Sequence, residues 1–165
     1  METLTEENKK QFRYAGFWLR FAAFLIDSFV LNILGLLFIL PFFGAIVLSV
    51  VGISNAGTND MFTFLGVTGI VGSVIAIVTV NLAVGWLYFA IMQSSKTQAT
   101  LGKMAIGAIV TDLKGNRISF GRATARYFSK MISNMTLNIG YILAGVTEKK
   151  QALHDMIAGT LVIKK

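Results

Sequence analysis

The chain contains no lysine or arginine between Arg20 and Lys96, although fifteen such residues lie elsewhere in its 165 residues. Hydrocarbon excludes charge, so a long interval without basic residues that is flanked by them is typical of chain embedded in a membrane. One carboxylate, that of Asp27, lies inside the first apolar run of this interval. Because a carboxylate in lipid is costly, Asp27 is a default candidate for a functional residue.

The overall composition agrees with a membrane location. Charged residues make up 14% of the chain, well below the ~25% that is usual for a soluble domain. The net charge of +7 is divided between the two ends of the apolar region. This division is typical of cytoplasmic flanks that meet anionic lipid headgroups, and it argues against a nucleic-acid partner. The absence of cysteine excludes disulfides and thiolate metal sites, and we expect neither a cofactor nor a metal.

Two apolar runs, 21–53 and 61–92, are each longer than a helix needs to cross a ~30 Å hydrocarbon core. Pro41 predicts a break in the first run. We predict transmembrane helices at about 16–40 and about 66–92, with an outer loop at 54–60 between them. The loop contains no basic residue, whereas 93–130 contains seven, so both termini are predicted to be cytoplasmic. Residues 1–13 are predicted to form a flexible cytoplasmic tail.

The part of the chain after residue 93 is more polar. Residues 104–111 are apolar and partly β-branched, and a turn signal follows at 114–116, so we predict a cytoplasmic β-hairpin over 104–119. Residues 160–163 are a candidate strand that can pair with this hairpin.

An amphipathic helix is predicted over 120–133, at the membrane interface. Arg122, Arg126 and Lys130 form a basic stripe four residues apart, beside an apolar face. This pattern is typical of a helix on an anionic membrane surface, so we expect the stripe to face lipid headgroups.

Residues 135–146 are apolar but too short to span comfortably, and basic residues lie on both sides. A full third span would place Lys149 and Lys150 outside, against the charge bias. We therefore favour a re-entrant or interfacial segment over a third span. The predicted fold is an all-α membrane protein with two long transmembrane helices, an amphipathic or re-entrant helical segment and a small cytoplasmic β-hairpin, in one domain over 14–165.

Arg20 and Asp27 are seven residues apart, so they return to nearly the same helix face about 10 Å apart along the axis. Burial disfavours a charged carboxylate, whereas a nearby arginine favours it. A carboxylate poised between these effects can bind and release a proton or a small cation. The spacing alone is equally consistent with a purely structural pair.

Four stretches of the sequence resemble the RDD family of bacterial membrane proteins: YAGFWLRFAAFLID at 14–27, LGKMAIG at 101–107, SFGR at 119–122 and QALHDMIAGT at 151–160. The resemblance covers nearly the whole chain. The arginine and two aspartates that name the family map onto Arg20, Asp27 and Asp155. The family is generally described as having unknown function, with ligand transport suggested and cation/proton exchange proposed for some members. The resemblance implies a multi-pass protein of the bacterial inner membrane.

The resemblance also adds Asp155 as a possible partner for Arg20. We expect these two side chains to pair and to dock the C-terminal motif at 151–160 against the first span. Asp27 is then expected to be the freer carboxylate, which exchanges an ion or a proton. Two further residues are candidate accessories. His154 can relay protons or form local hydrogen bonds, and Asn81 can line a polar path or bond between helices.

Two classes of function remain open. The first is a transporter that exchanges a small cation against protons, as a homo-oligomer because two spans are few to enclose a pathway. The second is a non-transporting adaptor that binds or regulates another membrane protein. No motif typical of an enzyme occurs in the sequence, so we expect no catalytic activity.

Overall fold

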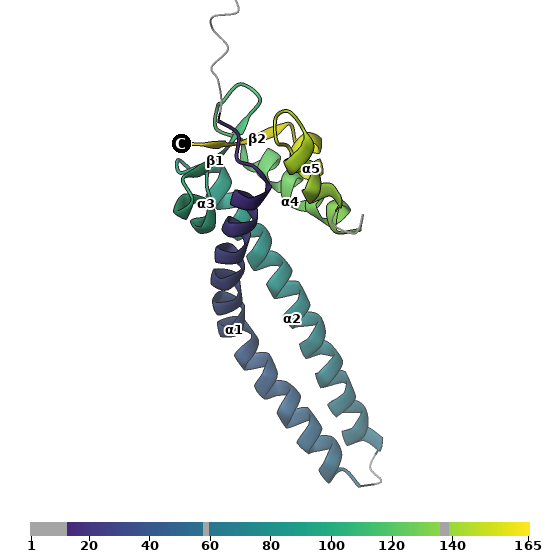
Figure 1. Ribbon diagram of the computed structural model, residues 1–165. Coiled ribbons are helices and arrows are strands. Elements are labelled where there is room, and N and C mark those ends of the chain that lie inside the picture. The colour runs from purple at the N-terminus through teal and green to yellow at the C-terminus, as the bar shows by residue number, and fades with distance from the viewer. Residues whose placement is uncertain (1–12, 58–59, 136–138) are drawn as a thin grey trace, which may run out of the picture. The chain divides into compact units, whose positions relative to one another are not determined.

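The computed structural model describes residues 13–57, 60–135 and 139–165 (Figure 1). Its elements in chain order are α1 (Phe17–Asn55), α2 (Asp60–Ser94), α3 (Leu101–Ala105), β1 (Ala108–Asp112), α4 (Phe120–Met135), α5 (Ile139–Val146), α6 (Leu153–Ile157) and β2 (Thr160–Lys164). They form two compact units. The helix-pair unit is Ser28–Tyr88, and the polar-core unit combines Met1–Asp27 with Phe89–Lys165.

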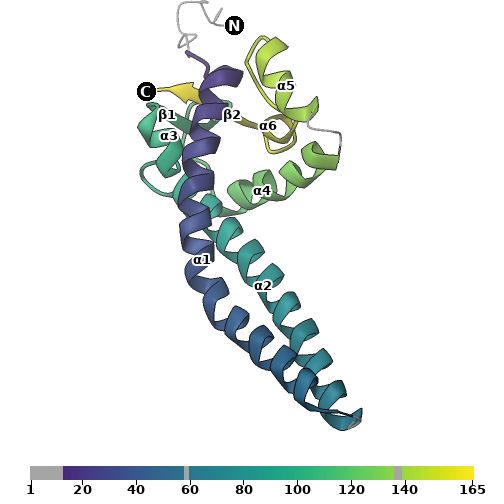
Figure 2. The same cartoon turned by 60° about the horizontal axis from the view of Figure 1, so that its bottom comes forward.

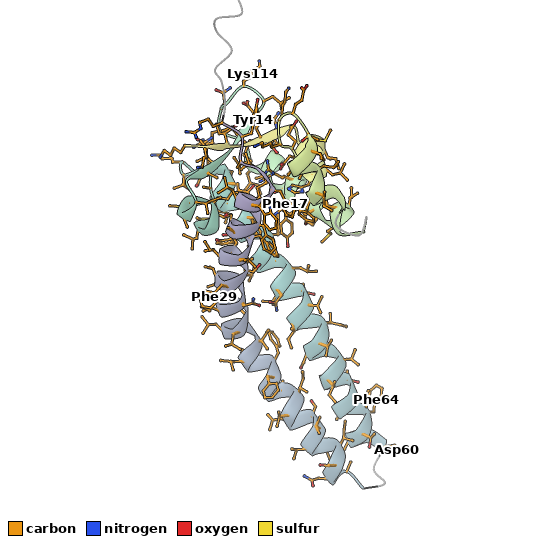
Figure 3. All side chains as sticks on the ribbon, viewed as in Figure 1. Tyr14, Phe17, Phe29, Asp60, Phe64 and Lys114 are labelled. Atoms are coloured by element: carbon orange, nitrogen blue, oxygen red, sulfur yellow. The ribbon has the colours of Figure 1, made fainter. Side chains whose placement is uncertain are left out.

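The helix-pair unit consists of the larger parts of α1 and α2, which run side by side in both views (Figures 1 and 2). Its large apolar side chains face outward. Phe29 is 68% exposed and Phe64 is 67% exposed, and both project away from the pair (Figure 3). Such exposure is unfavourable in water but suits a lipid environment. Both helices are long and apolar enough to cross a membrane, so they are candidate spans.

The two helices approach each other closely at glycines of α2. A Cβ atom added to Gly66 would lie 2.4 Å from Cγ1 of Ile53, and one added to Gly69 would lie 2.4 Å from Oγ of Ser49. Small residues allow this approach in membrane helices. The predicted break at Pro41 is wrong, because α1 continues through this residue. A continuous helix tolerates an internal proline where neighbouring structure holds the adjacent turns.

The polar-core unit contains a two-stranded antiparallel sheet. β1 pairs with β2 in a register that places Val110 opposite Val162. The chain before α1 extends this sheet, because Tyr14 bridges to Ile163 and the Ala15 N–H donates to the Val162 carbonyl at 2.9 Å. The candidate strand at 160–163 is therefore confirmed.

The predicted hairpin over 104–119 is wrong in its pairing. Residues 104 and 105 belong to α3, and β1 begins only at Ala108. The chain does turn back after Asp112, whose Oδ1 accepts from the N–H groups of Lys114 and Asn116 at 2.8 Å. Only one bridge follows, from Thr111 to Arg117, because α4 begins at Phe120 and leaves no room for a second strand.

The helices of the polar-core unit pack on one another. α4 contacts α5 and α6, and α5 contacts α6 (Figure 2). The predicted helix over 120–133 is confirmed as α4. Within the predicted segment 135–146, residues 136–138 lie outside the described residues, and the remainder forms α5. A helix of eight residues rises only ~12 Å, which is too short to cross a ~30 Å core.

Candidate functional site: two buried carboxylates

Asp155 lies in the first turn of α6 and is completely buried, with 0% of its surface exposed. Its carboxylate is fully engaged. Oδ1 accepts hydrogen bonds from Nε of Arg126 at 2.8 Å and from Nη2 at 2.5 Å. Oδ2 accepts from Nη1 of Arg20 and from the backbone N–H of Ala152, the latter at 3.1 Å. A buried carboxylate is stable only with such pairing, and here two guanidinium groups supply it.

Arg20 connects the start of α1 to the C-terminal motif. Besides Asp155, it donates from Nε to the Ala15 carbonyl at 2.8 Å and from Nη2 to the Lys150 carbonyl at 2.6 Å. The predicted ion pair between Arg20 and Asp155 is thus confirmed. None of the contacts of Arg20 within the described residues is with Asp27, so the direct Arg20–Asp27 pair that the helical spacing allowed does not form.

Arg126 is the second arginine that pairs with Asp155, although the sequence analysis expected it to face lipid headgroups. It is 2% exposed, and its Nη1 donates to Oε1 of Gln93 at 2.6 Å. The expectation that Arg126 faces lipid as part of a basic stripe is therefore wrong. Ala123, Ser129 and Ser133 lie on the same side of α4 and are also buried, so this face turns inward. The exposed face instead carries apolar side chains, namely Phe128, Met131 and Ile132.

Arg122 and Lys130, the other two residues of the predicted stripe, differ in exposure. Arg122 is exposed, as predicted, but Lys130 is only partly exposed and its Nζ lies 3.8 Å from the centroid of the Phe89 ring. The signal for this arrangement was present in the sequence as a row of small and polar residues beside Arg126. A row of this kind indicates close packing around the arginine rather than a solvated face.

The charges around Asp155 determine its protonation. Burial alone raises the pKa of a carboxyl group, but Arg126 and Arg20 outweigh this effect and hold the pKa of Asp155 well below its usual range. The two guanidinium groups of the cluster therefore favour the charged form of Asp155. Removing one partner of such a buried cluster is strongly destabilising.

Asp27, two turns after Arg20, has a different set of donors. It is 2% exposed. Its Oδ2 accepts from the Thr100 hydroxyl at 2.6 Å, and its Oδ1 accepts from the backbone N–H of Gly102 at 2.7 Å. The expectation of a freer carboxylate is wrong in geometry, because Asp27 is held in place. Both of these donors are nevertheless neutral groups.

Gly102 allows α3 to approach α1 closely enough for this contact. A Cβ atom at Gly102 would lie 2.0 Å from the Ala23 carbonyl oxygen and 2.9 Å from Cγ of Asp27. Only glycine fits such a position. Thr100 and Gly102 are functional candidates that the sequence analysis missed, although Gly102 lies within the LGKMAIG motif.

Comparison with known proteins identifies the family. The model of the RDD family matches residues 14–159. The chain belongs to the RDD family. Two relatives from Bacillus subtilis (strain 168) match this RDD protein. The match to the uncharacterized protein YxaI is 30% identical and covers 92% of this chain and 97% of YxaI. The match to the uncharacterized membrane protein YteJ is 35% identical and covers 91% of this chain and 80% of YteJ.

No solved structure matches this RDD protein. The family and the relative YteJ establish it as a membrane protein with two candidate spans. Its three signature residues, Arg20, Asp27 and Asp155, all belong to the polar-core unit. Within the described residues, no group of three histidine, aspartate or glutamate side chains could hold a metal ion.

His154 is buried beside Asp155, with 3.4 Å between its Nε2 and Oδ1 of the aspartate. Its ring also lies against that of Tyr141, with the centroids 5.3 Å apart. Burial lowers the pKa of His154 to about 2, against a smaller opposing effect of Asp155. The imidazole is therefore neutral near physiological pH, and its role as a proton relay stays a prediction.

Asn81, the other candidate accessory residue, lies in the helix-pair unit. Its Nδ2 donates to the Ile77 carbonyl at 2.8 Å. Its Oδ1 faces Gly35 of α1, where an added Cβ atom would lie 2.8 Å away. This geometry fits the interpretation of Asn81 as a residue at the contact between the two helices. Its role in a polar path stays a prediction.

Proposed function

We propose that this RDD protein is a multi-pass protein of the bacterial inner membrane, with α1 and α2 as its spans and both termini in the cytoplasm. The charge distribution supports this orientation. No basic residue lies between Arg20 and Lys96, which includes the connection between the two helices. The polar-core unit contains the basic residues and is then cytoplasmic. The exposed Arg122 of this unit is available to anionic headgroups.

We further propose that Asp27 exchanges a small cation against protons. The observation that carries this proposal is the difference between the two buried carboxylates. Asp155 cannot release its charge without leaving the buried guanidinium group of Arg126 and the partly buried one of Arg20 uncompensated. The hydroxyl and N–H donors of Asp27 are neutral, so a change in its charge breaks no ion pair with them. Its carboxylate and the Thr100 hydroxyl also offer the oxygen ligands that hard cations prefer.

Transport by this protein requires more than one copy in the proposed mechanism. Two spans are few to enclose a pathway through the bilayer, so we propose a homo-oligomer. The proposal contains no enzymatic step, in keeping with the lack of an enzyme motif in the sequence.

Flux measurements on purified protein in liposomes test the exchange proposal. A panel of alkali cations is supplied against an imposed pH gradient, and internal pH is followed with an entrapped dye. We expect the native protein to exchange at least one cation and Asp27→Asn to reduce that rate at least ten-fold. Asp60→Asn is the matched control, because Asp60 is an exposed aspartate at the start of α2. Equal rates for the native protein and Asp27→Asn would exclude Asp27 as the exchanging group.

A second candidate function is a membrane adaptor, which one specific observation favours. Arg20 and Asp155 are saturated by contacts inside their own unit, as expected of residues with an architectural role. Apolar side chains of α5, namely Ile142 and Val146, are exposed and available for contact with a partner protein. The adaptor predicts that native protein shows no flux in liposomes. It also predicts that a photo-crosslinker at residue 146 captures one membrane protein in cells, whereas a crosslinker at residue 114 does not.

A further inference from the structure

Two lysines of the polar-core unit converge on one aromatic ring. Lys103 comes from α3, Lys130 from α4, and the ring is that of Phe89 near the end of α2. Nζ of Lys130 lies 3.8 Å from the ring centroid and Nζ of Lys103 lies 5.8 Å from it. Both distances are within the ~6 Å reach of a cation–π contact. Tyr127 packs against the same ring, with its centroid 5.9 Å away.

The two lysine side chains are partly or fully withdrawn from solvent, and Asp27 attracts both of them electrostatically. Lys103 is 8% exposed and Lys130 is partly buried. Within the part of the chain that the structure describes, neither lysine forms an ion pair or a hydrogen bond. Asp155 is engaged by Arg20 and Arg126 instead. A buried ammonium group without an ion pair is costly, and an anion bound beside the two lysines offsets this cost and favours their charged forms.

Burial and neighbouring cations lower the pKa of both lysines, and the carboxylates of the unit oppose this shift in part. The pKa of Lys103 is lowered well below its usual range. Burial has the largest effect, and repulsion from Arg126 and from Lys130 adds to it. Burial, followed by repulsion from Arg126, lowers the pKa of Lys130 from 10.5 to about 7. Asp27 and Asp155 act in the opposite direction on Lys130 but only partly offset these effects.

We propose that Lys103 and Lys130 form a binding site for a phosphate-bearing anion beside the ring of Phe89. Two ammonium groups recognise a phosphate as point charges with several donors each. For a membrane protein, one source of such an anion is the headgroup of an anionic phospholipid, and free phosphate offers the same chemistry. The site differs from an exposed basic stripe, because its cations are held around one ring. It does not depend on ion exchange at Asp27.

Binding to the full-length protein in detergent tests this site. The two probes are dioctanoyl phosphatidylglycerol and inorganic phosphate, each titrated and followed by native mass spectrometry. We expect Lys103→Met and Lys130→Met each to weaken binding of the recognised probe at least ten-fold. Lys114→Met is the matched control, because Lys114 is an exposed lysine in the turn after β1 (Figure 3). Native affinity for both probes in the two site variants would overturn the proposal.

A second measurement uses only the native protein, in case a variant fails to fold. Amine acylation at Lys130 and Lys114 is followed by mass spectrometry with and without each probe. We expect the probe to slow acylation at Lys130 and to leave Lys114 unchanged. Protection by phosphatidylglycerol alone assigns the site to a lipid headgroup, whereas protection by both probes assigns it to phosphate anions in general. No protection of Lys130 by either probe would overturn the proposal.

Discussion

Asp27 and Asp155 are both buried aspartates of the polar-core unit, but the hydrogen-bond donors named for them differ in charge. Asp155 accepts from two guanidinium groups, whereas Asp27 accepts from a hydroxyl and a backbone N–H. Burial alone therefore does not separate the two carboxylates, to which the proposed function gives different roles. The charge of the donors named here does separate them, because protonation of Asp155 would break its ion pairs with Arg20 and Arg126.

The largest expected effect is the loss of Arg126. Arg126→Met leaves Oδ1 of Asp155 without two of its donors and Gln93 without its hydrogen-bond partner. Breaking a buried pair in this way costs about 3–5 kcal/mol. The free energy of unfolding of the protein in detergent micelles, measured by chemical denaturation, checks this value.

Arg122→Met is the matched control for this prediction. Arg122 lies one turn earlier on the same helix but is exposed, so we expect no measurable change. Equal destabilisation by the two variants would mean that Arg126 contributes only as a surface residue. The inward orientation of α4 would then be wrong.

The coupling between Arg20 and Asp155 is the next largest effect. In a double-mutant cycle with Arg20→Met and Asp155→Asn, we expect the two losses of stability to be non-additive by about 1–3 kcal/mol. A reversal of the two charges is not expected to restore stability, because an arginine at position 155 would face Arg126. Additive losses in the cycle would contradict a direct ion pair.

A substitution at Gly102 tests the close contact between α1 and α3 that surrounds Asp27. Gly102→Ala places a Cβ atom against the backbone of Ala23, which cannot move as a flexible side chain can. We expect a loss of about 1–3 kcal/mol in the free energy of unfolding. Gly121→Ala is the control, since no atom lies within 4 Å of its added Cβ, and it should stabilise α4 slightly. If Gly102→Ala has the same effect as Gly121→Ala, the close α1–α3 contact does not exist.

The pH dependence of stability separates His154 from the two aspartates. Its pKa is about 2 in the folded protein and 6.5 in the unfolded chain, so the unfolded chain binds more protons between these values. The stabilisation that His154 gives the folded protein is fully present above pH 6.5 and is lost progressively as the pH falls. At pH 5.5 we expect a loss of about 1.4 kcal/mol relative to pH 7.5.

His154→Gln should remove this dependence, and the assignment is unambiguous because the chain has a single histidine. The comparison is between the slopes of the two unfolding curves with pH, so any loss of packing in the variant does not affect it. A native protein whose stability is unchanged between pH 7.5 and 5.5 would show that His154 titrates normally and is accessible to protons.

Asp27→Asn should have the smallest effect on stability. Asparagine keeps the volume and one acceptor oxygen for the Gly102 N–H, and the Thr100 hydroxyl can accept from the new amide. We expect a change of less than about 1 kcal/mol in the free energy of unfolding, which is within the range of one neutral hydrogen bond. A loss as large as that of Arg126→Met would place Asp27 among the structural residues, together with Asp155.

The sequence was sufficient to predict the two long helices and the Arg20–Asp155 pair. Uninterrupted apolar runs indicate spans directly, and the family motifs placed Arg20 and Asp155 together. The orientation of α4 was not predictable from charge spacing, because the same stripe is expected of a lipid-facing helix and of one that buries an arginine against a carboxylate. The pairing of β1 was also misjudged, because a turn signal cannot show that the next strand is 48 residues away in the chain, from Asp112 to Thr160.

The most direct test of the account compares the two carboxylates in one sample. Infrared difference spectra of the protein in lipid nanodiscs record carboxyl bands when sodium, potassium or pH is changed. The account predicts one band that responds to the exchanged cation and disappears in Asp27→Asn, and no response from Asp155 over the same range. A responding band that persists unchanged in Asp27→Asn would contradict the account, and so would a titrating Asp155.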